Sequence, residues 1–524
     1  MSTNRRRERA LSPKLAVVFL FALLAVLVSA AAGNAAPTAV PTPYIRGTAP
    51  LPGPVAPAAR PAATMGIITA TRDTGPSGTP TTLTAKRLAP NADVSLVWMT
   101  SSVAWVLDPR ADSVDYIGRS VSKFGVVLAR LKTDAGGSFT YRTKFPQDFG
   151  GLHDIYAVVD GVQVARGGVL ITRRYQIWPK RGPVGTKINI KVSGLGSSLY
   201  ESGLGVYYDN KFSGIATANW TRGVATVSIR AAGPVGRHTL VMSSAMQANY
   251  LNPAQSPIPW ANLHNTTFTV TRDAGLPKTA VEWPLNVRPT ISPTTTLAAE
   301  NLLATSGKAS LSQSRGFVTG KATLTASGLT PGTPVSIVWA TVVGNRVNCV
   351  GICWVFSQVP MTTLQPNADG SLRSEITIPD GLGGWHFVQL LQNGRVMTQA
   401  PYFVQRNLIS VSDRSVRRGQ EITIRLKGIG WTQLDNTVAV VYDNGYIGYG
   451  CGFNSAGDVQ IKVTATGVRG THLIDLYPLL YTQNPVYATA TYGMVPFLSF
   501  RRDAPGLAVG YRLPAIRLAI KIVN

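Results

Sequence analysis

Short stretches in which apolar and polar residues alternate recur through most of the chain. Residues 187–192 (KINIKV), 421–426 (EITIRL) and 458–463 (DVQIKV) each place every second side chain on one face. Alternation with period two is typical of a β-strand with one buried and one solvated face. Gly, Pro, Asn and Asp separate these runs, as expected for turns between short antiparallel strands. The pattern predicts an all-β fold of β-sandwich domains without a long amphipathic helix.

Seven short motifs occur twice at nearly the same offset, which indicates an internal duplication. For example, residues 94–98 (VSLVW) return at 335–339 (VSIVW). The other pairs are 134–139 with 368–372, 150–153 with 383–386, 194–196 with 428–430, 208–210 with 442–444, 236–238 with 470–472, and 272–274 with 502–504. The offsets lie between 230 and 241 residues. One offset shared by that many matches is typical of a repeated unit.

Each repeated unit is long enough for two β-sandwich domains of about 100 residues. The expected domains are residues 64–172, 173–275, 304–405 and 406–505. A Pro-rich linker, residues 276–303, separates the two units, and a basic C-terminal segment, residues 506–524, follows the last domain. Residues 517–523 within this segment also alternate. They are expected either to complete the fourth domain or to add to a neighbouring sheet or subunit.

Residues 179–196 (PKRGPVGTKINIKVSGLG) resemble the opening of bacterial immunoglobulin-like repeats of the IPT/TIG kind. In that opening, Pro, Gly and Gly-Thr precede an alternating strand, and Gly-x-Gly follows it. The resemblance covers residues 170–270 and 405–500 well, and residues 64–171 and 305–404 more loosely. It implies tandem immunoglobulin-like sandwiches in a secreted or surface-exposed bacterial protein, where such repeats act as spacers, adhesive modules or enzyme accessories. The family has no catalytic residues to carry over.

The N-terminus has the three parts of a secretory signal. A basic stretch that includes Arg5 and Lys14 precedes an apolar run, residues 15–28, and small residues follow up to Ala32. The apolar run is shorter than the about 20 residues of a membrane span. Cleavage near Ala32 is therefore favoured over retention as a membrane anchor. Residues 33–63 are rich in Pro and Ala and are expected to form an extended linker, which places the folded part outside the cell or at its surface.

The charge balance is strongly basic although charged residues are scarce. The chain has 50 Lys and Arg against 25 Asp and Glu, a net charge of +25, but charged residues make up 14% of it. Loss of residues 1–32 removes five basic residues and Glu8, which leaves +21. A diffuse positive charge on an exported protein favours anionic cell-envelope polymers or glycans, or other surface proteins, as partners. Export and the absence of a Lys/Arg-rich helix argue against nucleic acid.

Four of the five histidines form two pairs across the duplication. They are His153 with His386 and His238 with His472. Each follows a glycine closely and precedes an apolar run, and no metal-ligand spacing accompanies them. We expect packed rings at the ends of strands and no metal site.

The motifs 208–210 and 442–444 (both YDN) are also duplicated. Asp and Asn between two strands predict hairpin turns, whereas a calcium site would need more acidic ligands nearby. The chain has no Gly-x-Ser-x-Gly elbow, phosphate-binding loop or His-Glu-x-x-His motif, and its acids are scattered. The sequence therefore predicts no catalytic residues, no cofactor and no enzyme activity.

Three cysteines remain: Cys349, Cys353 and Cys451. An exported protein is permitted a disulfide. A 349–353 bond would close a loop, and it is favoured. A bond from Cys349 or Cys353 to Cys451 would instead join two domains, and one thiol remains in each case.

Aromatic residues after Trp98 and Trp339 provide the one indication of a ligand. The tryptophans themselves are expected to face the core. The candidate contact residues in the segments that follow them are Trp105, Tyr116, Trp354 and Phe356. Loops on a rigid sandwich commonly carry binding sites. The sequence thus favours a non-catalytic structural or adhesive surface protein, with an extracellular glycan-binding module as the alternative.

Overall fold

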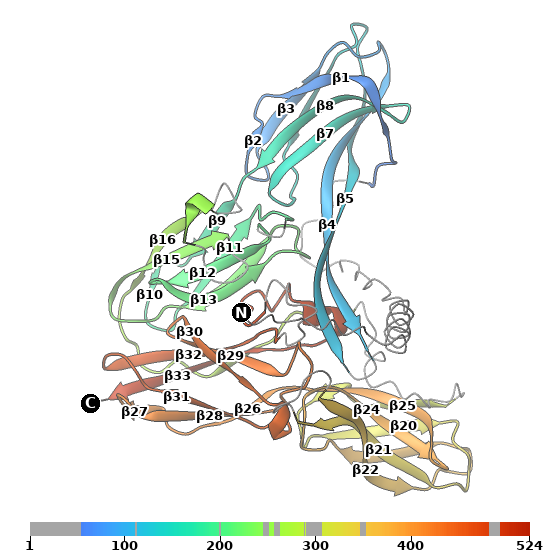
Figure 1. Cartoon of the computed structure of the whole chain (residues 1–524), viewed down its shortest axis with the longest axis vertical. Coiled ribbons are helices and arrows are strands. Elements are labelled where there is room, and N and C mark those ends of the chain that lie inside the picture. Colours follow the sequence, from blue (N-terminus) through green and yellow to red (C-terminus); the bar gives the residue numbers. More distant parts are fainter. Residues whose placement is uncertain are drawn as a thin grey trace, which may run out of the picture. The chain divides into compact units, whose positions relative to one another are not determined.

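The structure is a computed structural model that describes residues 54–110, 113–198, 201–244, 251–255, 263–287, 289, 307–345, 353–481 and 493–523. These residues are nearly all in strands and turns, with short 3-10 helices such as η6 (Pro505–Val509) (Figure 1). The predicted all-β fold of tandem β-sandwiches is confirmed. No helix in the described part of the chain is long and apolar enough to cross a membrane. The predicted signal, residues 1–32, lies outside the described residues.

The strands of the first sandwich pair in the order β5-β4-β7-β8-β1-β3-β6, and β2 pairs with β8. Strand β1 pairs with β8 in parallel and with β3 in antiparallel fashion, so it belongs to both layers. Buried side chains such as Leu96, Trp98 and Ile155 fill the space between the layers. The strands are β1 (Arg60–Ala70), β2 (Thr74–Gly75), β3 (Pro80–Ala85), β4 (Asp93–Pro109), β5 (Val114–Lys132), β6 (Phe139–Lys144), β7 (Gly151–Val159) and β8 (Val162–Ile171).

The second sandwich packs a three-stranded sheet, β14-β11-β9, against a five-stranded sheet, β10-β16-β15-β12-β13. In β11, Ile188, Ile190 and Val192 are buried, and Lys187 and Lys191 are exposed, as the alternation predicted. The strands are β9 (Arg174–Trp178), β10 (Arg181–Gly182), β11 (Lys187–Ser193), β12 (Gly203–Tyr208), β13 (Lys211–Thr217), β14 (Ala225–Arg230), β15 (Gly236–Ser244) and β16 (His264–Val270).

The third sandwich has the sheets β18-β20-β23 and β19-β25-β24-β21-β22. Trp339 lies in its core beside Ile337 and Tyr402. The strands are β18 (Lys308–Leu311), β19 (Arg315–Gly316), β20 (Lys321–Ser327), β21 (Val335–Gly344), β22 (Trp354–Leu364), β23 (Leu372–Thr377), β24 (Gly384–Gln392) and β25 (Arg395–Val404).

The fourth sandwich has the sheets β26-β28-β31 and β17-β33-β32-β29-β30. Its core is rich in Ile and Val, including Ile422, Val440 and Ile520. The strands are β17 (Ala280–Glu282), β26 (Asn407–Val411), β27 (Ser415–Arg417), β28 (Glu421–Lys427), β29 (Thr437–Tyr442), β30 (Gly445–Cys451), β31 (Val459–Thr464), β32 (Gly470–Pro478) and β33 (Ala515–Val523).

Three of the domain limits drawn from the sequence differ from the structure. Strand β1 begins at Arg60, within the expected linker of residues 33–63. The linker of residues 276–303 contributes β17, which pairs with β33. The expected end of the fourth domain at residue 505 is too early, because β33 pairs with β32 over seven positions. The C-terminal segment, residues 506–524, therefore supplies a strand of the fourth sandwich and is not a separate tail.

One of the seven repeated motifs is not structurally equivalent in the two units. Residues 272–274 follow β16, whereas residues 502–504 precede β33. Strands β16 and β33 occupy the same place, since β16 pairs with β15 and β33 pairs with the equivalent β32. The second unit carries a longer segment before this strand, which breaks the constant offset. The match between 272–274 and 502–504 is therefore coincidental.

Candidate functional site

The hairpin of β4 and β5 extends well beyond its sheet and carries two of the predicted contact residues (Figure 1). The indole Nε1 of Trp105 donates a hydrogen bond to Oδ1 of Asp503 over 3.0 Å. The backbone amide of Tyr116 donates to Oε1 of Gln433 over 3.0 Å. Both Trp105 and Tyr116 are 0% exposed and share a core with residues of the second and fourth sandwiches. The far end of the hairpin is thus part of an internal junction.

Asp503 is the polar centre of this junction. The backbone amide of Asn219 in the second sandwich donates to its Oδ2, opposite the bond from Trp105. Burial raises the pKa of Asp503 to about 6, and the hydrogen bonds from Asn219 and Trp105 act in the opposite direction. The carboxyl is fully buried, which leaves no room for a substrate beside it. Its hydrogen bonds to Trp105 and Asn219 connect the first, second and fourth sandwiches.

A second buried carboxyl, Asp148, joins the first sandwich to the second. Its Oδ2 accepts a hydrogen bond from the indole of Trp98 over 2.8 Å, and its Oδ1 pairs with the guanidinium of Arg222 at 2.7 Å. Burial lowers the pKa of Arg222, and Asp148 opposes that shift. A buried charge pair of this kind is stable only while both partners are present.

The paired histidines His153 and His386 are structural in the described fold. His153 stacks on Trp98 with ring centroids 4.5 Å apart, and His386 stacks on Trp339 at 4.6 Å. The ring nitrogens of His386 lie 3.2 and 2.9 Å from the carbonyl oxygens of Ala340 and Leu382. Burial lowers the pKa of His386 to about 4, which keeps its ring neutral near pH 7.

The other pair, His238 and His472, is held by the duplicated Asp-Asn motifs. In both units Nδ1 of the histidine lies 2.6 Å from Oδ2 of the aspartate, which is Asp209 or Asp443. Burial by itself would lower the pKa of His472, but its hydrogen bond to Asp443 raises it. Among the residues that the structure describes, no group of three or more His, Cys, Asp or Glu side chains could hold a metal ion.

The Asp-Asn motifs form the tight turns that the sequence predicted. Asp209 and Asn210 have φ angles of 48° and 61°, and Asp443 and Asn444 have 44° and 62°. Each dipeptide connects two paired strands, β12 to β13 and β29 to β30. Two consecutive positive φ angles are typical of a type I′ hairpin turn. The turn interpretation is confirmed at both places.

A buried charge cluster lies between the second and fourth sandwiches. Arg230 of β14 pairs with Asp475 of β32 at 2.5 Å, and Arg517 of β33 contacts the same carboxylate at 3.2 Å. Arg517 also pairs with Glu282 at 2.9 Å. Burial alone would raise the pKa of Glu282, but Arg517 and Lys187 lower it to about 2. Both carboxylates of the cluster are paired with basic groups, and the cluster therefore has the character of a structural contact.

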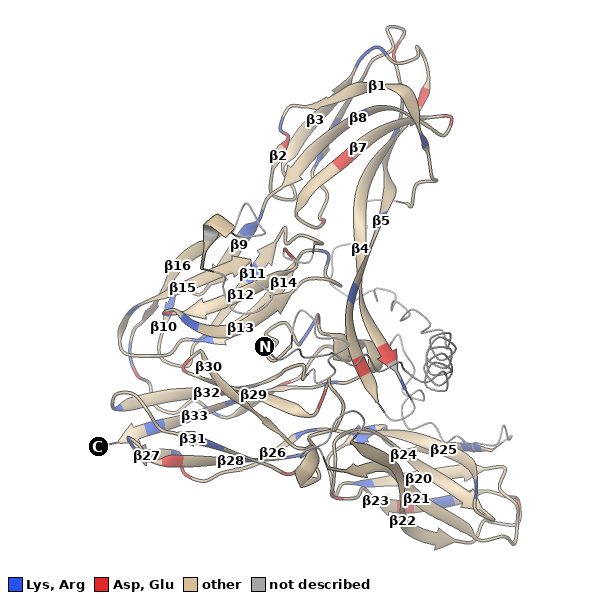
Figure 2. Ribbon diagram, in the orientation of Figure 1, with Lys and Arg blue, Asp and Glu red and all other residues tan. Residues whose placement is uncertain are grey.

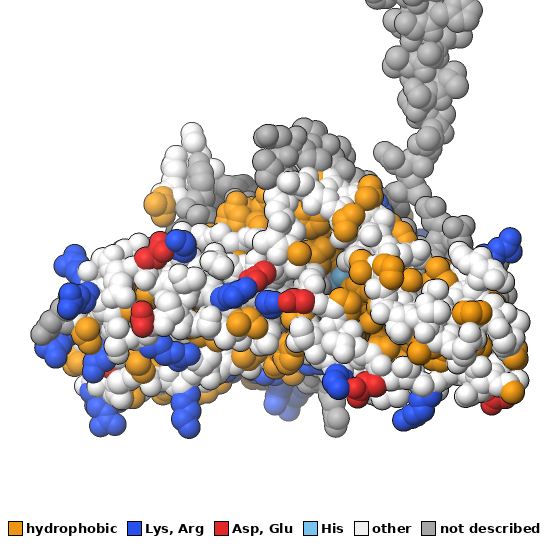
Figure 3. All heavy atoms as spheres, turned by 90° about the horizontal axis from the view of Figure 1, so that it is seen from below, with side chains coloured by type: hydrophobic (Ala, Val, Ile, Leu, Met, Phe, Trp, Pro, Cys, Tyr) orange, Lys and Arg blue, Asp and Glu red, His pale blue; other side chains and the backbone are white. Residues whose placement is uncertain are grey.

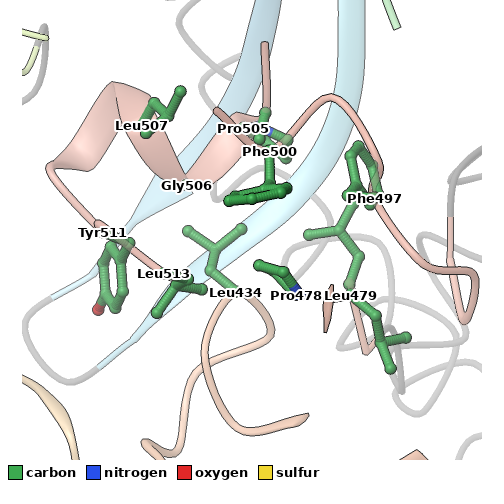
Figure 4. Close-up of a pocket in the computed structure, with 12 residues that line it drawn as sticks. Leu434, Pro478, Leu479, Phe497, Phe500, Pro505, Gly506, Leu507, Tyr511 and Leu513 are labelled. Atoms are coloured by element: carbon green, nitrogen blue, oxygen red, sulfur yellow. The ribbon is translucent and has the colours of Figure 1, made fainter. Parts of the chain in front are cut away.

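A small apolar cavity lies beside η6 (Figure 4). Leu434, Phe497, Phe500 and Leu513 are among the side chains that line it. Its volume is about 30 Å³, which is room for little more than one water molecule. This cavity is too small and too apolar for a substrate.

Two of the four predicted contact rings are wrong as exposed ligand contacts. Trp105 and Tyr116 are buried because other sandwiches cover both faces of the hairpin that carries them. Trp354 is half-buried, and its ring centroid lies 5.6 Å from that of Phe453. Phe356 on β22 is 41% exposed. A role of Trp354 and Phe356 in glycan binding stays a prediction.

The structure shows the state of two of the three cysteines. Cys353 is disulfide-bonded, and Cys451 is exposed at the end of β30. Cys349 lies outside the described residues, so the 349–353 bond stays a prediction.

Two features of the structure were not predicted from the sequence. The contact of Trp105 with Asp503 has no local signal, since the two residues are 398 positions apart. Trp178, in contrast, could have been found from the pattern. In RYQIW the alternation places Ile177 inward and Trp178 outward, and the side chain of Trp178 is 47% exposed.

Comparison with known proteins adds little to this description. No protein-family model and no curated protein match the sequence. The chain is similar to a Salmonella alpha-2-macroglobulin mutant at 8% identity and a TM-score of 0.17, over 88% of this chain but 31% of that one. It is similar to FdeC, described as an Escherichia coli adhesin, at 12% identity and a TM-score of 0.15, over 67% and 99% of the two chains. An ICAM-5 ectodomain fragment shows 10% identity and a TM-score of 0.17, over 88% and 100%.

With TM-scores this low, these likenesses carry no argument about function. They also leave the resemblance to IPT/TIG repeats as an expectation. The fold itself defines a protein of tandem β-sandwiches, and its buried polar groups hold the sandwiches together.

Proposed function

We propose that the protein is a non-catalytic, exported structural and adhesive protein that associates with anionic polymers of the cell envelope. The observation that carries the proposal is the different fate of its acidic and basic side chains. Within the described residues, twelve carboxylates form a salt bridge. Their partners are ten Lys or Arg side chains and three histidines. Most of the Lys and Arg side chains that the structure describes take part in none of these pairs.

The surface that this leaves is basic over a wide area. Figure 3 shows blue Lys and Arg side chains spread over one face, with fewer red carboxylates, several of them directly beside a blue group. Figure 2 shows the same scatter of charges along the strands of all four sandwiches. A spread of unneutralised bases raises the local concentration of polyanions and does not require a pocket.

The internal junctions support a scaffold role. Asp148, Asp475 and Asp503, the most deeply buried carboxylates in these contacts, bind residues of a different sandwich or a distant strand. These three buried carboxylates hold neighbouring domains in position, while unpaired Lys and Arg side chains make the exterior basic. Both properties suit a spacer that presents a charged surface.

The test is salt-dependent binding of the full chain to beads that carry polyglutamate or alginate, with neutral dextran beads as the control. We expect retention on both polyanions at an ionic strength of about 0.05 M and release at about 0.5 M, because salt screens exposed charges. Equal retention at both ionic strengths, or equal binding to dextran, would contradict the proposal.

A further inference from the structure

One flat surface of the second sandwich combines an exposed aromatic ring with amides and cations. It is the outward face of the sheet β14-β11-β9, and we call it the β9 face. Its side chains come from alternate positions of β9 and β11, where Trp178 pairs with Asn189 and Gln176 pairs with Lys191. Arg174 pairs with Ser193 at the other end. The β9 face is therefore defined by Arg174, Gln176, Trp178, Asn189 and Lys191.

Trp178 is unlike the other tryptophans of the described chain. Trp98, Trp105, Trp220, Trp339, Trp385 and Trp431 are buried, and Trp283 and Trp354 are half-buried. Trp178 is 47% exposed on an edge strand of the sheet. A single exposed apolar side chain needs no explanation by itself. The groups around this ring are what point to a ligand.

The β9 face carries positive charge that no acid of its own strands neutralises. The strands β9, β11 and β14 contain no Asp or Glu. Within the described residues, Arg174 and Lys191 form no salt bridge. At the margin Lys187 pairs with Glu282. Lys180 reaches the other sheet instead, where its Nζ donates a hydrogen bond to Oγ1 of Thr266 in β16. The face is thus complementary to a negatively charged ligand.

The second unit supplies an internal reference for this surface. Strand β28 of the second unit corresponds to β11, and its Thr423 corresponds to Asn189. Ser412 lies opposite Thr423, as Trp178 lies opposite Asn189, so Ser412 occupies the place of Trp178. The equivalent of Lys191 is Arg425, which is bound to Asp458. Two more cations of that face, Lys427 and Lys462, pair with Asp380 and Glu421. The duplicated face has no ring at this place, and Arg425, Lys427 and Lys462 are paired with acids, so neither feature of the β9 face is required by the fold.

We propose that the β9 face binds an anionic polysaccharide. The apolar C–H groups of a sugar ring would lie against the negative face of the Trp178 indole, which carries the quadrupole of an aromatic ring. Arg174 and Lys191 would pair with the acidic groups of the polymer. The amide of Gln176 would bind its hydroxyls, and so would the side-chain oxygen of Asn189, whose Nδ2 donates to the carbonyl oxygen of Trp178. This inference rests on the proposed function. It adds a defined site at which Trp178 contacts the sugar ring, in addition to the attraction between opposite charges.

The experiment compares the full wild-type chain with three variants on three probes. Alginate is a polymer of acidic sugars, polyglutamate has carboxylates but no sugar ring, and dextran is a neutral sugar polymer. Trp178→Ser installs the residue of the second unit. Arg174→Gln together with Lys191→Gln removes the charges of the face, and the control Arg418→Gln removes an exposed charge of the fourth sandwich. Affinity is measured by titration, and quenching of Trp fluorescence reports contact with the ring.

We expect Trp178→Ser to weaken alginate binding about tenfold, which corresponds to about 1.4 kcal/mol. Its binding to polyglutamate should equal that of the wild type. The double Gln variant should weaken binding to both polyanions more than Arg418→Gln does. Since Trp178 is an exposed residue, Trp178→Ser should unfold at the wild-type temperature, which separates binding from folding.

Several outcomes would overturn the inference. Unchanged alginate affinity in Trp178→Ser would exclude the β9 face as the sugar site, while salt-sensitive binding by the wild type would leave the proposed function standing. An equal loss toward alginate and polyglutamate would show that the ring does not recognise a sugar. Dextran binding as tight as alginate binding would remove the charge requirement. If the wild type bound neither polyanion, the proposed function and this inference would fail together.

Discussion

The indole of Trp105 in the first sandwich donates its hydrogen to the carboxyl of Asp503, a residue 398 positions further along the chain. Both side chains are buried in the core that the second and fourth sandwiches share. Because Asn219 of the second sandwich bonds to the same carboxyl, one residue fixes three domains. The contact turns the long β4–β5 hairpin into a strut, and the stability of the scaffold should depend on it.

Trp105→Ala should therefore destabilise the protein strongly. Truncation of a buried Trp costs about 3–5 kcal/mol, and here it also removes a donor from a buried carboxyl. The measurement is the first unfolding transition in a denaturant titration. Trp178→Ala, which truncates an exposed ring, is the control and should change stability by about 0.5 kcal/mol or less. Equal effects of the two substitutions would show that the junction does not stabilise the fold.

The charge cluster between the second and fourth sandwiches predicts a second large effect. Asp475→Asn leaves Arg230 and Arg517 buried without their shared carboxylate, and breaking a buried pair costs about 3–5 kcal/mol. The matched control is Glu421→Gln, since Glu421 pairs with Lys462 at the surface. Surface pairs are worth about 0–1 kcal/mol. A urea titration of both variants checks the difference, and a mild effect of Asp475→Asn would mean that the cluster adds little net stability.

The two Asp-Asn turns allow a comparison within one molecule. Asn444 donates from Nδ2 to the carbonyl oxygen of Arg230 over 2.7 Å, so it connects two sandwiches, whereas Asn210 is exposed. Glycine adopts the positive φ of both sites without strain. Asn444→Gly should cost about 1–3 kcal/mol because it leaves a buried carbonyl unpaired. Asn210→Gly should be nearly neutral, and thermal unfolding of the two variants distinguishes them; similar melting temperatures would contradict the assignment.

The buried His386 predicts a loss of stability in acid. Its pKa is lowered to about 4 by burial, below the ordinary value of about 6.5. The unfolded chain therefore binds more protons between these values, and stability falls as the pH drops from about 6.5 toward 4. The full shift corresponds to roughly 3 kcal/mol.

His386→Phe keeps a flat ring beside Trp339 but cannot take up a proton. Denaturant titrations between pH 7 and 4 should show that the wild type loses roughly 3 kcal/mol more than this variant. Parallel curves would show that His386 titrates normally in the folded protein.

The strand pattern could be predicted because alternation is a local property, and the duplication because short motifs recur at nearly one offset. Ile188, Ile190 and Val192 alternate with polar residues and are buried as expected. The repeated Asp-Asn pairs fold as turns because Asp and Asn tolerate a positive φ in a short connection. The same alternation places Trp178 of β9 on the outward face, next to the buried Ile177.

The pattern failed where another domain covers a strand. In β4, Val103, Ala104, Trp105 and Val106 are all buried, so the alternation of inner and outer faces is lost. The match of residues 502–504 to 272–274 failed for a related reason, because a longer segment enters before β33 and packs as η6 against the β4–β5 hairpin. Neither change is visible in a window of a few residues.

By itself, the sequence determined the all-β class, the two repeated units, the turns and the excess of positive charge, because these depend on neighbouring residues or on simple counts. Only the tertiary structure decided which charged and aromatic side chains are buried and which are exposed. Trp105 and Asp503 are 398 positions apart in the chain and meet only in the folded protein. Removal of water from a polar group depends on its neighbours in space and not on its neighbours in sequence. The same packing left Trp178 and the unpaired cations of the β9 face in contact with solvent.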